Sequence, residues 1–136
     1  MRYLIDTNVL INIVVDDYIS NDVRAIFDDY ENQIYVSSES VKEFIHLIQT
    51  ERIVLHKNFR SLDVFDLIEN KFELNVKYVT KEHLRTFSKL ATVEGHNDPS
   101  DRLIIAQAIT EEIPLISSDT KFPKYTKFGL EFISNR

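Results

Sequence analysis

The sequence predicts an α/β domain with three layers, α/β/α, built on a five-stranded parallel sheet. Short apolar runs typical of strands alternate along the chain with longer stretches whose apolar residues recur at helical spacing. Such alternation is typical of a parallel sheet with helices on both faces. The first run, Tyr3-Leu4-Ile5, shows no polar alternation, as expected of a strand buried on both sides. A chain of 136 residues makes one ordinary domain, so residues 1–136 are assigned to a single unit.

The expected elements follow in order along the chain. They are a strand at 3–5, helices at 9–15 and 21–30, a strand at 34–37, a helix at 38–52, a phenylalanine-rich helix or helix pair at 56–72, a strand at 74–79, helices at 80–91 and 98–110, and strands at 114–117 and 130–133. Ser20 or Asn21, Thr80 and Asp98 stand where helix caps are expected, and Pro99 occupies the first-turn position that tolerates proline.

The polarity of the strands predicts their order in the sheet. The first and fourth strands are the most uniformly apolar, whereas the third and fifth alternate as edge strands do. An order of 3-2-1-4-5 satisfies both patterns and places the topological switch point between the first and fourth strands. Ligands of open α/β sheets bind at that point, beyond the carboxyl ends of the strands, where Asp6 and Asp119 emerge.

Composition narrows the classes of function. The net charge of −6 argues against a protein that wraps nucleic acid by bulk electrostatics, although an acidic metal site would itself inflate the count of acids. The absence of cysteine excludes thiolate metal sites and disulfides and fits the cytoplasm, and no apolar run approaches the ~18 residues of a membrane span. Neither of the two glycines lies in a phosphate-binding glycine loop.

Four acids are candidates for chemistry, and three of them also have a structural interpretation. Asp119 could simply form an Asx turn after the fourth strand. Asp101 could serve the first turn of a helix capped by Asp98, although its spacing to Ile105 and Ala108 places it on the stripe facing the sheet. Glu43 could complete a capping box with Ser40.

The histidines add no candidate site. His46, His56, His83 and His96 show no metal-ligand spacing among themselves, and we expect them at the surface or the edge of the core.

Three segments resemble the PIN-domain family, and in particular the VapC-type toxins of bacterial toxin–antitoxin pairs. They are Leu4-Ile5-Asp6-Thr7-Asn8-Val9-Leu10, Asp98-Pro99-Ser100-Asp101-Arg102-Leu103-Ile104-Ile105-Ala106-Gln107-Ala108 and Ile116-Ser117-Ser118-Asp119-Thr120-Lys121-Phe122, with a helical Glu43 between the first two. The resemblance covers essentially the whole chain. Ser117 stands where threonine is frequent in the family, and basic residues near the site are few.

This resemblance implies a metal-dependent ribonuclease with the expected sheet order, a homodimeric state and inhibition by a cognate antitoxin. The acidic cluster would comprise Asp6, Glu43, Asp101 and Asp119, supported by Asn8, Asp98 and Ser117.

Converging carboxylates repel one another, and a hard divalent ion relieves that repulsion. Oxygen ligands alone point to Mg²⁺ or Mn²⁺, which can activate water for attack on an RNA phosphodiester. Nearby cations are candidates for phosphate contacts, namely Arg102, Lys121, Lys124 and Lys127.

Two alternatives remain at the level of sequence. A phosphatase of the haloacid dehalogenase type also places an aspartate after its first strand, but it needs a second acid two residues later, where this chain has Asn8. A non-catalytic PIN-like module for RNA binding or regulation would not need all four acids. RNA cleavage with and without EDTA would separate it from an enzyme.

Overall fold

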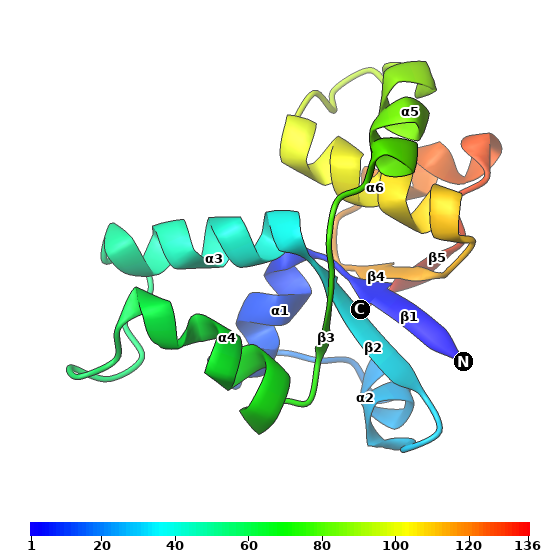
Figure 1. Cartoon of the computed structure of the whole chain (residues 1–136). Coiled ribbons are helices and arrows are strands. Elements are labelled where there is room, and N and C mark those ends of the chain that lie inside the picture. Colours follow the sequence, from blue (N-terminus) through cyan, green and yellow to red (C-terminus); the bar gives the residue numbers. More distant parts are fainter.

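Five parallel strands form the one sheet, in the order β3-β2-β1-β4-β5 (Figure 1). The computed structural model describes residues 1–136, the whole chain. The strands are β1 (Arg2–Ile5), β2 (Gln33–Ser37), β3 (Asn75–Lys77), β4 (Leu115–Ser117) and β5 (Phe132–Ser134). The predicted order is therefore confirmed. Ile5 of β1 lies opposite Ile116 of β4, so Asp6, the residue after β1, lies beside Ser117, the last residue of β4.

Helical segments cover both faces of the sheet. They are α1 (Thr7–Val14), α2 (Asn21–Asp28), α3 (Ser38–Gln49), the 3-10 turn η1 (Ser61–Asp63), α4 (Val64–Asp66), the π-helical turn η2 (Leu67–Lys71), α5 (Lys81–Lys89), α6 (Pro99–Glu111) and the 3-10 segment η3 (Phe122–Phe128). None of the helices is both long and apolar enough to cross a membrane.

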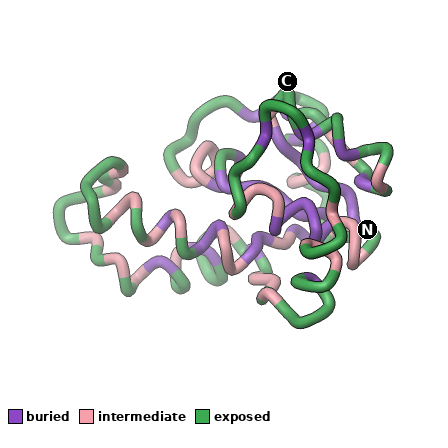
Figure 2. The backbone as a smooth tube through the Cα atoms, turned by 90° about the horizontal axis from the view of Figure 1, so that it is seen from above, coloured by how far each residue is buried: buried purple, intermediate pink, exposed green.

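The hydrophobic core has two parts, one on each face of the sheet. Tyr3 and Ile5 pack with residues of α1 to α4, whereas Leu4, which points the opposite way from the same strand, packs with α6 and η3. Both Leu4 and Ile5 are fully buried, which confirms that β1 is covered on both sides. Figure 2 shows the buried residues concentrated around the sheet, while the distal loop after α3, residues 50–60, is mostly exposed.

Side-chain caps start the helices where the sequence predicted them. The Ser20 hydroxyl accepts the N–H of Val23 at the start of α2, and the Asp98 carboxylate accepts the N–H of Asp101 at the start of α6. Thr80 caps α5 by accepting the N–H of His83. These polar residues explain why each helix begins where it does.

The phenylalanine-rich segment differs from the regular helix or helix pair that was predicted over residues 56–72. A loop continues to Arg60, and η1, α4 and η2 then follow one another with three different helical pitches. The residues fully buried there are Val64 and Ile68, whereas Leu62 is 69% exposed and Phe65 is 38% exposed. The change of pitch breaks the constant rotation per residue on which the prediction relied, and it leaves apolar side chains on the surface.

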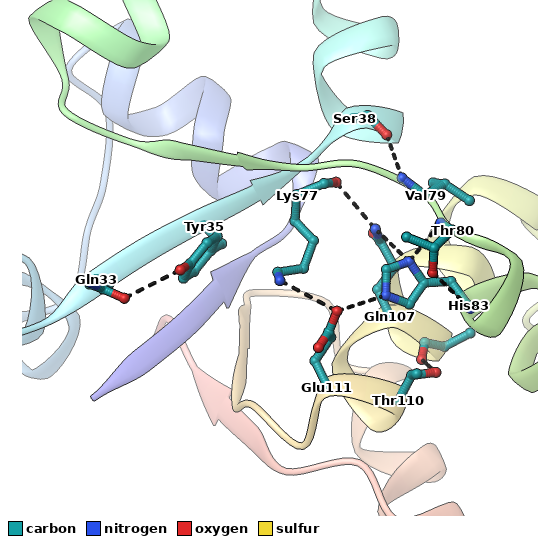
Figure 3. Close-up of polar contacts among 11 residues, drawn as sticks. Gln33, Tyr35, Ser38, Lys77, Val79, Thr80, His83, Gln107, Thr110 and Glu111 are labelled. Carbon is teal, nitrogen blue, oxygen red and sulfur yellow. Dashed lines mark hydrogen bonds and ion pairs between the residues drawn. The ribbon is translucent and has the colours of Figure 1, made fainter.

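A partly buried polar network fastens α5 to α6 and to the edge of the sheet (Figure 3). The His83 Nδ1 accepts the N–H of Thr80 at 3.0 Å, so the ring proton lies on Nε2 and is donated to Glu111 Oε1 at 3.0 Å. Lys77 Nζ lies 3.4 Å from the same Glu111 oxygen, and Gln107 donates to the Lys77 carbonyl. His83 is only 1% exposed. The expectation of a surface or core-edge position is therefore wrong for this histidine.

Candidate metal centre

Asp6 lies at the end of β1 and also begins α1, a second role that the sequence did not reveal. Its Oδ1 accepts the N–H of Val9 at 2.9 Å, and its Oδ2 accepts the Ser117 hydroxyl at 2.5 Å. The side chain is 3% exposed. Burial, and to a smaller extent the charges of Asp101 and Asp119, raise its pKa to about 6, although these two hydrogen bonds act in the opposite direction. Asp6 is therefore a buried carboxyl that feels two neighbouring acids.

The end of β4 joins Asp119 to the same site. While the Ser117 hydroxyl donates to Asp6, its oxygen accepts the Asp119 N–H at 3.0 Å. Asp119 Oδ1 accepts the Lys121 N–H at 2.8 Å, which is the Asx turn considered from the sequence. The turn uses Oδ1 only and leaves Oδ2 without a protein hydrogen bond. Asp119 can therefore form the Asx turn and still offer Oδ2 to a metal ion.

Asp101 enters the site from the first turn of α6. Asp98 supplies the cap, so the Asp101 carboxylate is left to face other groups. Its Oδ2 lies 3.4 Å from His96 Nε2. Burial raises the pKa of Asp101, as do the charges of Asp98 and Asp119, while His96 acts in the opposite direction. Asp101 thus has a helix-start position and a side chain inside the acidic cluster.

Glu43 reaches the cluster from the interior of α3. Ser37 caps this helix by accepting the Glu39 N–H at 3.0 Å, which excludes the alternative in which Ser40 and Glu43 form a capping box. Glu43 is half-buried, and its pKa is raised by burial first and then by the charge of Asp101. The charge of Asp101 acts on both Asp6 and Glu43, and that of Asp119 acts on Asp101, so the four predicted acids lie in one neighbourhood. Only Asp101 and Asp119, together with His96, bring ligand atoms within 4.8 Å of one another, and neither Asp6 nor Glu43 belongs to that group.

His96 was not predicted to belong to the site. It is 4% exposed, so the expected surface or core-edge position is wrong for it as well. One of its ring nitrogens lies with carboxylate oxygens of Asp101 and Asp119 so that all three atoms are within 4.8 Å of one another. Its Nδ1 lies 2.6 Å from the hydroxyl of Tyr125. The one available signal was its place five residues before Asp101, whereas Tyr125 carried no signal.

The predicted supporting and basic residues occupy different positions. Asn8 is exposed in the first turn of α1, and Lys121 and Lys124 are exposed after β4. Arg102 is half-buried, donates to the Leu90 carbonyl at 2.8 Å and lies over the Phe87 ring. Its guanidinium is engaged in joining α6 to the end of α5, so phosphate contact stays a prediction better suited to the two lysines.

The chemistry of the donor set fits a divalent cation. No lysine or arginine forms an ion pair with any of the four acids, and the one basic side chain in contact with them is the imidazole of His96 beside Asp101. Burial and mutual repulsion raise the pKa of Asp6, Glu43 and Asp101. A hard cation coordinated by carboxylate oxygens removes both costs.

Solved structures with a similar fold include members of the VapBC family of toxin–antitoxin systems. VapBC2 from Rickettsia felis, solved bound to a DNA fragment from its promoter, has a TM-score of 0.72 at 16% identity, with 98% of each chain covered. DNA-bound VapBC from Salmonella typhimurium has a TM-score of 0.72 at 15% identity, covering 100% of this chain and 99% of that one. FitAcB from Neisseria gonorrhoeae has a TM-score of 0.65 at 17% identity over 96% of both chains.

No curated protein sequence matches the chain. The model of the family described as "PIN domain" matches residues 3–127, which include every predicted acid. This match does not support the haloacid dehalogenase alternative. Because it spans nearly the entire chain, the protein belongs to the PIN domain family.

Proposed function

We propose that the protein is an Mg²⁺- or Mn²⁺-dependent endoribonuclease that hydrolyses RNA phosphodiester bonds, and that it is the toxin of a toxin–antitoxin pair. The observation that carries this proposal is that Asp6, Glu43, Asp101 and Asp119 lie close enough for their charges to act on one another, in a partly buried setting and without a lysine or arginine ion-pair partner. Carboxylates in such a setting are suited to holding a metal and poorly suited to stabilising a fold.

The chain's own residues would divide the work between metal binding and RNA binding. A divalent ion bound here supplies Lewis-acid activation of water and neutralises charge on the phosphodiester. Asp6, Asp101 and Asp119 would hold the ion, with the Ser117 hydroxyl fixing the orientation of Asp6. Glu43 faces the same space from α3. Lys121 and Lys124, exposed on the segment after β4, would contact RNA phosphates.

Cleavage of labelled single-stranded and hairpin RNAs tests the activity. We expect cleavage in millimolar Mg²⁺ or Mn²⁺, none in excess EDTA, and a loss of at least about a hundredfold in Asp6→Asn or Asp119→Asn, because each change removes a charge from the metal site. Asp28→Asn, an exposed acid at the end of α2, is the matched control and should keep full activity. Cleavage that persists in EDTA, or wild-type activity in Asp6→Asn, would refute the proposal.

The surface of the phenylalanine-rich segment is the candidate interface for partners. Leu62 and Phe65 are exposed there, together with Val54 in the preceding loop. Apolar residues grouped on a surface favour association. We propose that this face contributes to a homodimer and to binding of a small antitoxin protein, with both proteins in the cytoplasm. The similar folds of VapBC and FitAB complexes support an antitoxin partner.

A further inference from the structure

We propose that His96 is a positioning residue for the metal site: as a hydrogen-bond donor fixed by Tyr125, it holds the Asp101 carboxylate in the orientation that binds the cation. This inference rests on the proposed metal-dependent function. It assigns His96 a role outside the ligand set, which would then consist of oxygen atoms only.

Hydrogen-bond chemistry sets the direction of the chain from Tyr125 to Asp101. The Asp101 carboxylate only accepts hydrogen bonds, so the contact between Asp101 Oδ2 and His96 Nε2 at 3.4 Å requires a ring proton on Nε2. In the neutral ring Nδ1 is then the acceptor, and the Tyr125 hydroxyl, 2.6 Å away, is the donor that faces it. A neutral imidazole that accepts at Nδ1 carries its proton on Nε2, which faces Asp101 Oδ2 at 3.4 Å.

The surroundings of His96 leave its ring little freedom to turn. The Phe122 and Tyr125 rings meet it edge to face, at centroid distances of 5.6 and 5.3 Å. The backbone N–H of His96 donates to the Val93 carbonyl at 3.1 Å, which closes a turn through Gly95. Gly95 has φ +79, a conformation that favours glycine. The turn therefore delivers His96 to a fixed place in front of α6.

A role as a metal ligand would require the opposite tautomer. The Nε2 atom would then offer a lone pair, and Nδ1–H would donate to the Tyr125 phenol oxygen. Without a proton on Nε2, the contact with the Asp101 carboxylate would set two acceptors against each other. The observed contacts at both ring nitrogens favour the Nε2–H form, and with it the positioning role.

Manganese binding, followed by electron paramagnetic resonance, tests the role without relying on catalysis. We expect His96→Ala to weaken Mn²⁺ binding about ten- to a hundredfold, the usual effect of removing a group that orients a ligand. His96→Gln, whose amide can still donate to Asp101, should recover part of the loss. Tyr125→Phe should weaken Mn²⁺ binding, because without the phenol hydroxyl the His96 ring proton is no longer held on Nε2. His83→Ala removes an equally buried histidine away from the site and should leave Mn²⁺ affinity unchanged.

The ¹⁵N chemical shifts of the histidine rings provide a spectroscopic signature that packing alone would not move. We expect His96 to be Nε2–H in EDTA and to remain so in saturating Mg²⁺. A ring that loses its Nε2 proton when Mg²⁺ is added would make His96 a ligand and overturn the proposal.

The variants also separate this inference from the proposed function. If Asp101→Asn weakens Mn²⁺ binding while His96→Ala and Tyr125→Phe do not, the positioning role is wrong and the metal site stands. If Asp101→Asn leaves binding unchanged, the metal site itself is wrong. Should His96→Ala fail to fold, His96→Gln and Tyr125→Phe decide the matter, because unchanged Mn²⁺ affinity in Tyr125→Phe would refute the hydrogen-bonded chain.

Discussion

The substitution Asp6→Asn is expected to destabilise the metal-free protein at acidic pH and to stabilise it at neutral pH. In the folded protein the pKa of Asp6 is about 6, compared with an ordinary value of 3.8. Between these values the folded state binds more protons than the unfolded state, so stability falls as pH rises. The loss of stability that comes from ionising the buried Asp6 carboxyl is absent below about pH 4 and fully present above about pH 7. Asp6→Asn removes the carboxyl that titrates and with it this part of the pH dependence.

The magnitude follows from the same two pKa values. At about 1.4 kcal/mol for each pH unit, the interval from 3.8 to about 6 corresponds to roughly 3 kcal/mol of lost stability at neutral pH. The variant also weakens the hydrogen bond from Ser117, which costs about 1 kcal/mol at every pH. Asp6→Asn should therefore be about 1 kcal/mol less stable than wild type at pH 4 and about 2 kcal/mol more stable at pH 7.5, or about −4 and +8 °C in Tm.

Urea and thermal unfolding from pH 4 to pH 8, in EDTA throughout, measure this difference. Asp28→Asn is the control for loss of a surface charge, and its curve should run parallel to that of wild type. Millimolar Mg²⁺ should stabilise wild type at pH 7.5 more than Asp6→Asn, because the variant binds the ion more weakly. A site whose Kd is a hundredth of the Mg²⁺ concentration stabilises the folded state by about 2.7 kcal/mol. Wild-type and Asp6→Asn curves that stay parallel over the whole pH range would refute a buried carboxyl with a raised pKa.

Three further variants test other parts of the site and surface. Asp101→Asn should stabilise the metal-free protein at pH 7.5 and gain less from Mg²⁺ than wild type, whereas a residue serving only the helix dipole would cost a few tenths to about 1 kcal/mol in both conditions by thermal unfolding. Glu43→Gln should weaken Mn²⁺ binding, measured by titration calorimetry, without lowering metal-free stability, because Ser37 caps α3; a lower Tm would restore a structural role. Phe65→Glu should keep the Tm and lose the dimer in light scattering, with the exposed Tyr30→Glu as control; a wild-type protein that is monomeric at tens of micromolar would contradict the dimer.

Sequence patterns predicted most of the fold because its elements are regular. The uninterrupted apolar run before Asp6, the proline after Asp98 and the edge-like alternation at 74–79 are local signals, and each corresponds to an observed element. The order of the strands also followed from how apolar each one is. The prediction for residues 56–72 was less accurate because three helical pitches follow one another there, so no single period describes which side chains face inward.

The candidate site was predicted in part, and what was missed depends on contacts that are distant in sequence. His96 meets Tyr125 across 29 residues, a relation that no spacing rule among histidines can reveal. His83 fills the place of a capping-box acid by accepting the Thr80 N–H through its ring nitrogen, which a search for glutamate or glutamine overlooks. Asp6 and Ser37 show a related limit, because each ends a strand and caps a helix at once.

The contact between Asp6 and Ser117 joins parts of the chain 111 residues apart, and this has a consequence for the order of folding. A partly folded chain in which β4 has not yet paired with β1 lacks the arrangement of acids altogether, so nuclease activity can arise only when the sheet closes. Contacts of such separation form slowly. The repulsion among the carboxylates then raises the free energy of the native state more than that of the transition state. This difference speeds unfolding. A bound cation is therefore expected to prolong the lifetime of the folded protein while changing its folding rate little.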